Sequence, residues 1–346
     1  MKKTILFIAL ILLLIRPASA MEFTAPAVPE SGEAFMPLET ESFAEGLWYV
    51  VKSALSTLQP SIAEAAKICL SLIAIVLLAS LLNTFSGAPQ RVVEVVSTIT
   101  ISILLLQPSN ALIRLGVETV EELCEYGKLL LPVMTAAMAA QGGVTASAAL
   151  YTGTALFNSL LTSVVSRLIV PMLYIYLCLS VANSAIGEEV LKNLRSFVKW
   201  LMTWCLKLVL YVFTGYMGIT GVVSGSADAA AIKAAKLAIS GAVPVVGGIL
   251  SDASETILVS AGIMKSAAGV YGLLAILAVW IGPFLQIGIQ YLLLKITAAV
   301  CGVFGVKHSV SIVQDFSGAM GFLLAMTGTV CLLLLISTVC FMRGTA

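Results

Sequence analysis

Residues 319–342 read AMGFLLAMTGTVCLLLLISTVCFM, and no charged side chain interrupts them. A run of about 20 apolar residues is long enough to cross a bilayer as one helix. Five more runs of crossing length are Ile68–Phe85, Val92–Ile113, Leu201–Val223, Ile257–Trp280 and Phe284–Gly305. Hydrophobic residues make up 60% and charged residues 11% of the chain, whereas soluble domains average about 45–50% and about 25%. The sequence therefore predicts an all-α, polytopic helical membrane protein.

The N-terminus has the pattern of a cleavable signal peptide. Two lysines precede the apolar run Ile5–Ile15, which as a helix of about 16 Å cannot cross about 30 Å of hydrocarbon. Ala18–Ala20 supplies the small residues that signal peptidase needs. We expect residues 1–20 to be removed and the mature chain to begin outside the cytoplasm. The alternative is an uncleaved anchor.

Residues 21–66 form an acidic segment with seven glutamates and one lysine. The prolines and acids of its first half predict a flexible tail. The apolar spacing from Phe43 to Lys67 predicts an amphipathic helix on the outer membrane surface. Residues 67–346 would then be the multi-spanning membrane domain.

The basic residues indicate how the crossings are oriented. Cytoplasmic loops carry an excess of Lys and Arg, which places Glu188–Lys199 inside. The acidic stretch Arg114–Lys128 is then predicted to be an outside loop in which Cys124 is a free thiol. The same orientation places Lys307 outside.

The number of crossings depends on the apolar stretch Leu129–Ile186. It is interrupted at Gln141–Gly143 and at Arg167, so it accommodates one crossing or three. With the N-terminus outside and Arg343 inside, the chain is predicted to have seven or nine transmembrane helices.

The sequence lacks the residues that most catalytic sites need. His308 is the only histidine, which excludes an HExxH zinc helix, and the seven cysteines include no CxxC pair. Gly127-Lys128 is not followed by Ser or Thr, so it is not a Walker A loop. An intramembrane aspartyl protease is disfavoured because all three aspartates lie at predicted helix ends or loops: Asp228, Asp252 and Asp315. We expect no enzyme, cofactor or metal site, and the net charge of +1 indicates no nucleic-acid partner.

Charges inside apolar runs are costly and often functional. Glu94 lies three residues after Arg91, and the two are predicted to pair on one helix face. Lys207 and Lys295 lie near predicted ends of crossings, where their side chains reach the interface. Lys265 lies beside glycines at helical spacing, a face that lets helices approach closely. It is therefore either next to a packing seam or a pore or interface residue.

The apolar piece at residues 241–252 is too short to cross the bilayer. A proline and a Gly-Gly pair break its helical pattern, and an Asp and a Glu three residues apart can cap the next helix. Such a break at membrane depth must be buried in protein or line a wet cavity. The piece is either an interfacial elbow or a re-entrant hairpin beside a conduction path. Its candidate pore or interface residues are Pro244, Gly247, Gly248, Asp252 and Glu255.

Glu188–Leu206 is predicted to be an interfacial helix on the cytoplasmic leaflet. An apolar stripe lies beside a basic stripe formed by Lys192, Arg195 and Lys199. These three residues either orient and anchor the helix or dock a cytoplasmic partner.

The stretch SGAVPVVGGILSDASE (Ser240–Glu255), with the signal peptide, the acidic segment and the polytopic body, resembles the stage III sporulation protein AE family. The resemblance implies a multi-pass protein of the mother-cell membrane around the engulfed forespore of an endospore-forming bacterium. It also implies a channel-like complex with a cytoplasmic ATPase and extracytoplasmic ring-forming subunits. It supplies no catalytic or ligand residues.

Two classes of function remain. The first is a membrane subunit, or the conduit itself, of such a channel complex, in which several copies of the chain could assemble within the lipid bilayer. The alternative is a stand-alone secondary transporter of a small solute, for which inverted repeats and ion-coupling acids are expected. The sequence has no evident internal repeat and few acids in its apolar runs, which favours the first class.

The glycines of the 241–252 piece separate its two interpretations. Gly247→Leu and Gly248→Leu in a conduit lining should abolish sporulation at normal membrane abundance, because a bulky side chain fills space that only backbone occupies. In an elbow, spore yield and abundance should fall in parallel. Asp252→Asn should rescue what Asp252→Ala loses if the residue is only an N-cap. Spore counts and membrane immunoblots of all four variants decide between the two.

Overall fold

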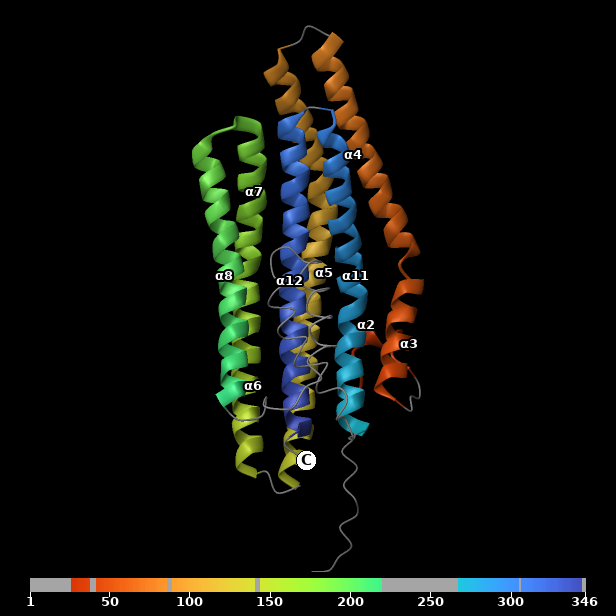
Figure 1. Cartoon of the computed structure of the whole chain (residues 1–346), viewed down its shortest axis with the longest axis vertical. Coiled ribbons are helices and arrows are strands. Elements are labelled where there is room, and N and C mark those ends of the chain that lie inside the picture. The colour runs from red at the N-terminus through yellow and green to blue at the C-terminus, as the bar shows by residue number, and fades with distance from the viewer. Residues whose placement is uncertain are drawn as a thin grey trace, which may run out of the picture.

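The computed structural model describes residues 26–37, 42–85, 89–140, 144–219, 267–304 and 306–343. All the regular elements in these ranges are helices (Figure 1), and six helical segments are long and apolar enough to cross a membrane. The prediction of an all-α, polytopic membrane protein is confirmed. The predicted signal peptide lies outside the described residues.

The helices differ widely in length. In chain order they are α2 (Glu30–Glu33), α3 (Phe43–Ser56), α4 (Gln59–Phe85), α5 (Gln90–Ala140), α6 (Val144–Val164), the π-helical turn η1 (Val165–Ile169), α7 (Val170–Ile186), α8 (Glu189–Ile219), α11 (Ala267–Gly302) and α12 (Lys307–Arg343). Helix α5 has 51 residues, about 76 Å at 1.5 Å per residue, far more than a bilayer requires. The segment from α6 through η1 to α7 is helical without a break, and it returns the chain from the end of α5.

Helix α12 is the centre of the bundle. Figure 1 shows it with α7 and α8 on one side and α5 and α11 on the other. Its whole apolar segment is buried, including the large side chains of Phe316, Phe322 and Phe341. A helix that is apolar on every face is either surrounded by lipid or the centre of a protein core, and here the neighbouring helices surround it.

The two ends of the bundle differ. The turn end holds the last residues of α4, α7 and α11 and the first residues of α5, α8 and α12 (Figure 1). There Ser80 Oγ donates to the Phe304 carbonyl at 3.2 Å. The tail end holds α2, α3, the start of α11 and the end of α12, where Met342 packs against Gly269. The tail end therefore holds both the first described helices, α2 and α3, and the last residues of α12.

The predicted loop Arg114–Lys128 was wrong, because this stretch is an uninterrupted part of α5. Its glutamates and lysine are good helix formers, and most of them lie on the exposed side of the helix. Cys124 faces the other way and is free but 1% exposed. Its backbone carbonyl accepts a hydrogen bond from Asn158 Nδ2 at 3.0 Å.

The predicted break between two crossings near residue 281 was also wrong. Pro283 lies inside α11, and the helix continues from Ala267 to Gly302. A proline removes one backbone hydrogen bond, and packing against α12 outweighs that loss. As a consequence Lys307 lies at the turn end with Lys192, and α12 ends at Arg343 at the tail end, the reverse of the predicted placement. The described residues hold six crossing helices. The predicted total of seven or nine stays a prediction, because residues 220–266 lie outside the described ranges.

The N-terminal segment also differs from the flexible tail that was expected. Residues 26–37 pack onto the bundle, with Gly32 against Val279 of α11 and the Ser31 hydroxyl donating to the Glu122 carboxylate. The amphipathic region is broken at residues 57–58 into α3 and α4. Helix α3 begins at the N-cap Ser42, which accepts from the Glu45 amide at 3.3 Å, and packs against α11. The side of α3 that carries Val50 and Ala54 is buried, whereas three large apolar side chains stay exposed: Trp48, Tyr49 and Leu55.

The central position of α12 predicts that a Leu→Ala substitution lowers the free energy of unfolding more in α12 than at an exposed position of α11. Leu323 is fully buried in α12 and Leu292 of α11 is 56% exposed. Leu323→Ala should lower the free energy of unfolding by about 2 to 5 kcal/mol because it leaves a cavity. Leu292→Ala should change it by about 0.5 kcal/mol. Thermal unfolding of the purified chain in detergent measures both, and equal shifts would contradict a packed centre at α12.

Candidate functional site

Six of the candidate residues from the sequence lie outside the described residues, so their roles stay predictions: Pro244, Gly247, Gly248, Asp252, Glu255 and Lys265. The other three candidates, Lys192, Arg195 and Lys199, all lie in the first turns of α8.

Helix α8 begins after a sharp turn at the turn end. Gly187 has φ 80°, a left-handed conformation that glycine adopts without strain, and its N–H donates to the Asn183 carbonyl at 2.8 Å. The exposed face of α8 then presents Phe197, Trp200 and Trp204, whose neighbouring rings stack with centroids 5.9 and 6.3 Å apart. Exposed aromatic side chains of this kind are typical of a membrane interface.

The predicted basic stripe of α8 is divided. Lys192 and Lys199 are exposed, as expected of a membrane-facing or partner-facing residue. Arg195 instead turns inward and forms an ion pair with Asp315 of α12. The two side chains are only 16% and 13% exposed. Only the lysines are therefore free to meet lipid headgroups or a partner.

The ion pair is part of a three-helix cluster. The Tyr176 hydroxyl of α7 donates to Asp315 Oδ1 at 3.4 Å, so α7, α8 and α12 all contribute a polar group. Asp315 was predicted at a helix end or loop and in fact lies inside α12. A lone acid among apolar residues needs a partner when it is buried, and that requirement could have pointed to a basic residue on a neighbouring helix.

A second polar contact joins α5 to α12 at the turn end. Glu94 accepts from Gln90 Nε2 at 3.0 Å, and its other oxygen lies 3.8 Å from His308 Nε2. The predicted pair with Arg91 was wrong, because the glutamate side chain reaches across to α12. His308 also contacts Gly187, so the α7–α8 turn, α5 and α12 meet at the only histidine.

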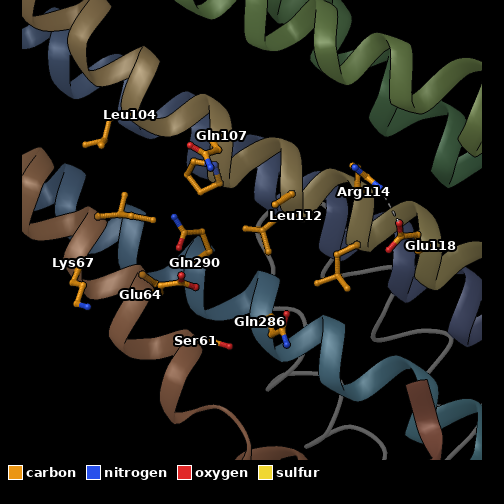
Figure 2. Close-up of a pocket in the computed structure, with 15 residues that line it drawn as sticks. Ser61, Glu64, Lys67, Leu104, Gln107, Leu112, Arg114, Glu118, Gln286 and Gln290 are labelled. Atoms are coloured by element: carbon orange, nitrogen blue, oxygen red, sulfur yellow. Dashed lines mark ion pairs between the residues drawn. The ribbon is translucent and has the colours of Figure 1, made fainter. Parts of the chain in front are cut away.

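A cleft of about 800 Å³ lies between α4, α5 and α11. Figure 2 shows polar side chains from all three helices around it. They are Ser61, Glu64, Lys67, Gln107, Arg114, Glu118, Gln286 and Gln290. Arg114 and Glu118 approach each other at 3.8 Å on the exposed rim. Sequence reasoning missed this cleft because its parts were assigned to a surface helix, a crossing and a loop.

The described residues contain no group of three or more His, Cys, Asp or Glu side chains that could hold a metal ion. The polar clusters that they do contain are ion pairs and amides. Such groups can hold helices together and can bind a polar or charged partner.

The Arg195–Asp315 pair yields a stability prediction. Arg195→Leu should lower the free energy of unfolding by about 3 to 5 kcal/mol, because it leaves the Asp315 carboxylate without its partner. The double variant Arg195→Leu, Asp315→Leu should recover most of that loss. Lys199→Leu, one turn further along α8, is the exposed control. If thermal unfolding gives the same shift for Arg195→Leu as for Lys199→Leu, the pair does not hold the helices together.

Comparisons with known proteins identify the relatives of this chain. The family model of stage III sporulation protein AE matches residues 32–344. The stage III sporulation protein AE of Bacillus subtilis (strain 168) is 19% identical over 302 residues, which cover 86% of this chain and 75% of the relative. No solved structure matches the chain. Because the family model spans nearly all of the described bundle, the chain belongs to the stage III sporulation protein AE family.

Proposed function

We propose that the chain is a non-enzymatic membrane subunit of a channel-like complex in the mother-cell membrane around the forespore, needed for endospore development. Membership of the family supports a role in sporulation. The energy would come from a separate cytoplasmic ATPase, and ring-forming extracytoplasmic subunits would complete the channel.

The proposal of a subunit that does not conduct through its own centre rests on one observation. Helix α12 occupies the axis of the bundle, and its apolar segment is buried throughout. Its hydroxyl groups are satisfied within the protein, as Thr329 donates to the Ala325 carbonyl at 2.7 Å and Ser337 bonds Thr154 of α6 at 2.8 Å. A wet path along this axis would have to displace the central helix. The chain would therefore act as a wall or scaffold, with any conduit lying between it and neighbouring subunits or copies.

The charges at the two ends support two different partner faces. The turn end exposes Arg91, Lys192, Lys199 and Lys307, and an excess of basic residues favours the cytoplasm. The ATPase would dock there. The exposed glutamates of α2, α3 and the lower part of α5 lie toward the tail end (Figure 1), where the ring-forming subunits would bind.

Deletion of the gene should leave vegetative growth unchanged and stop forespore development after engulfment. A triple variant in the complemented strain reverses the charge of the docking face: Lys192→Glu, Lys199→Glu and Lys307→Glu. It should keep normal membrane abundance but lose co-purification of the ATPase and lower the spore yield, because the charges that attract the partner are reversed. The readouts are spore counts, membrane immunoblots and affinity purification from sporulating cells.

The matched control reverses exposed acids toward the other end, Glu118→Lys, Glu121→Lys and Glu125→Lys, and should retain the ATPase. A vegetative growth defect with intact sporulation would contradict the proposal. Uptake of a solute by the purified chain alone in liposomes would favour the stand-alone transporter.

A further inference from the structure

The cleft between α4, α5 and α11 lies at a boundary between apolar and charged surface. The apolar run of α4 begins at Ile68, and that of α5 ends at Ile113. Glu64 and Lys67 come just before the apolar run of α4, and Arg114 comes just after that of α5. All three line the cleft (Figure 2). The cleft therefore lies where the apolar runs of α4 and α5 give way to charged residues, on the side of the tail end.

Gln290 of α11 gives the cleft an amide group that no described protein atom pairs with. Its side chain is only 6% exposed and makes no hydrogen bond to any other described residue. Figure 2 shows it inside the cleft, between Gln107 of α5 and Glu64 of α4. The residue is nearly buried but its amide atoms open into the cleft, so an occupant with polar atoms can pair with them.

A proline adds a backbone acceptor to the same wall. Pro108 lies inside α5 and has no N–H, so the Leu104 carbonyl one turn earlier loses its usual intrahelical donor. Both residues line the cleft. The cleft thus offers amide donors from Gln290 and Gln107, beside a carbonyl that lacks its usual helical donor.

The charges of the cleft are balanced. Lys67 and Arg114 provide two positive groups, and Glu64 and Glu118 provide two negative groups. An occupant of one sign would be repelled by half of them, whereas a zwitterion with separated charges can meet both. The cleft volume of about 800 Å³ is in the range of small-ligand sites, about 300 to 1,000 Å³.

The surface on the turn-end side of the cleft is apolar. Beyond the charged rim, α4 exposes Leu70, Leu77 and Leu81, and α5 exposes Ile99 and Ile103. A molecule bound in the cleft at this depth can therefore extend into the hydrocarbon along α4 and α5.

We propose that this cleft is a specific binding site for a phospholipid with a zwitterionic phosphate–ammonium headgroup, such as phosphatidylethanolamine, from the leaflet on the tail-end side. Arg114 binds the phosphate, and Glu118, one turn further along α5, binds the ammonium group. Lys67 and Glu64 offer the same two charges on α4, at the other side of the cleft. Gln290 donates to the ester region, and the acyl chains lie against the exposed leucines of α4. The lipid would fasten α4, the helix with the least buried apolar segment, to α5 and α11.

The test uses the full purified chain in mild detergent and native mass spectrometry. Phosphatidylethanolamine and phosphatidylglycerol with identical acyl chains are titrated separately. We expect phosphatidylethanolamine to bind about tenfold more tightly, and Gln290→Leu to weaken it about tenfold because its hydrogen bonds are lost. Gln314→Leu, an exposed glutamine of α12 away from the cleft, is the matched control and should leave binding unchanged.

A second variant guards against misfolding of the first. Lys67→Glu with Arg114→Glu changes only exposed rim residues and should lose phosphatidylethanolamine binding while size-exclusion profile and helical circular dichroism stay normal. Equal affinity for the two lipids, or unchanged binding in this rim variant, would overturn the proposal and leave only nonspecific boundary lipid. Binding of soluble glycerophosphoethanolamine as tight as that of the lipid would also overturn it and indicate a solute site. These readouts are independent of sporulation, so they do not depend on the proposed function.

Discussion

Helix α12 packs against other helices on every side, and this close packing determines how the rest of the bundle is arranged. A helix at a lipid boundary needs only one face compatible with protein, but the apolar segment of α12 is buried throughout. Helices α5 and α11 supply the largest contacts and α6, α7 and α8 cover the remaining faces. Because the helix has a full ring of neighbours, none of them can move far without exposing part of it. The bundle is therefore expected to behave as a rigid body.

The polar groups inside the bundle follow from the same constraint. Serine and threonine side chains on the buried helices donate to carbonyls of their own helix or bond a hydroxyl on a neighbour, as Ser97 and Ser309 do at 3.0 Å. The charges that enter the interior come as a pair, Arg195 with Asp315. A single buried charge would be costly, but the pair and the Tyr176 hydroxyl satisfy one another. The pair fixes the rotation of α8 against α12 and leaves Lys192 and Lys199 facing outward.

A solid centre and two ends of opposite charge fit a subunit that builds a larger assembly better than one that conducts alone. In the proposed function, the exposed basic residues of the turn end and the exposed glutamates toward the tail end would give the chain a direction across the membrane. The cleft between α4, α5 and α11 adds a mixed-charge surface at the hydrocarbon boundary, where a lipid can stabilise the most exposed helix. A conduit between such subunits would be lined by outward faces, so the residues that matter for passage would lie at interfaces between chains.

The sequence by itself determined the membrane class, the apolar runs and the family, because these properties depend on composition and on local spacing along the chain. It also located the basic start of α8. It could not determine whether Arg114–Lys128 is a loop or part of α5, since charged helix formers suit either, and the choice depends on what packs against Cys124. It placed Asp315 and Glu94 with the wrong surroundings because their partners are on other helices. Which side chains meet across helices depends on the rotation and length of each helix within the bundle, and only the tertiary structure decided those.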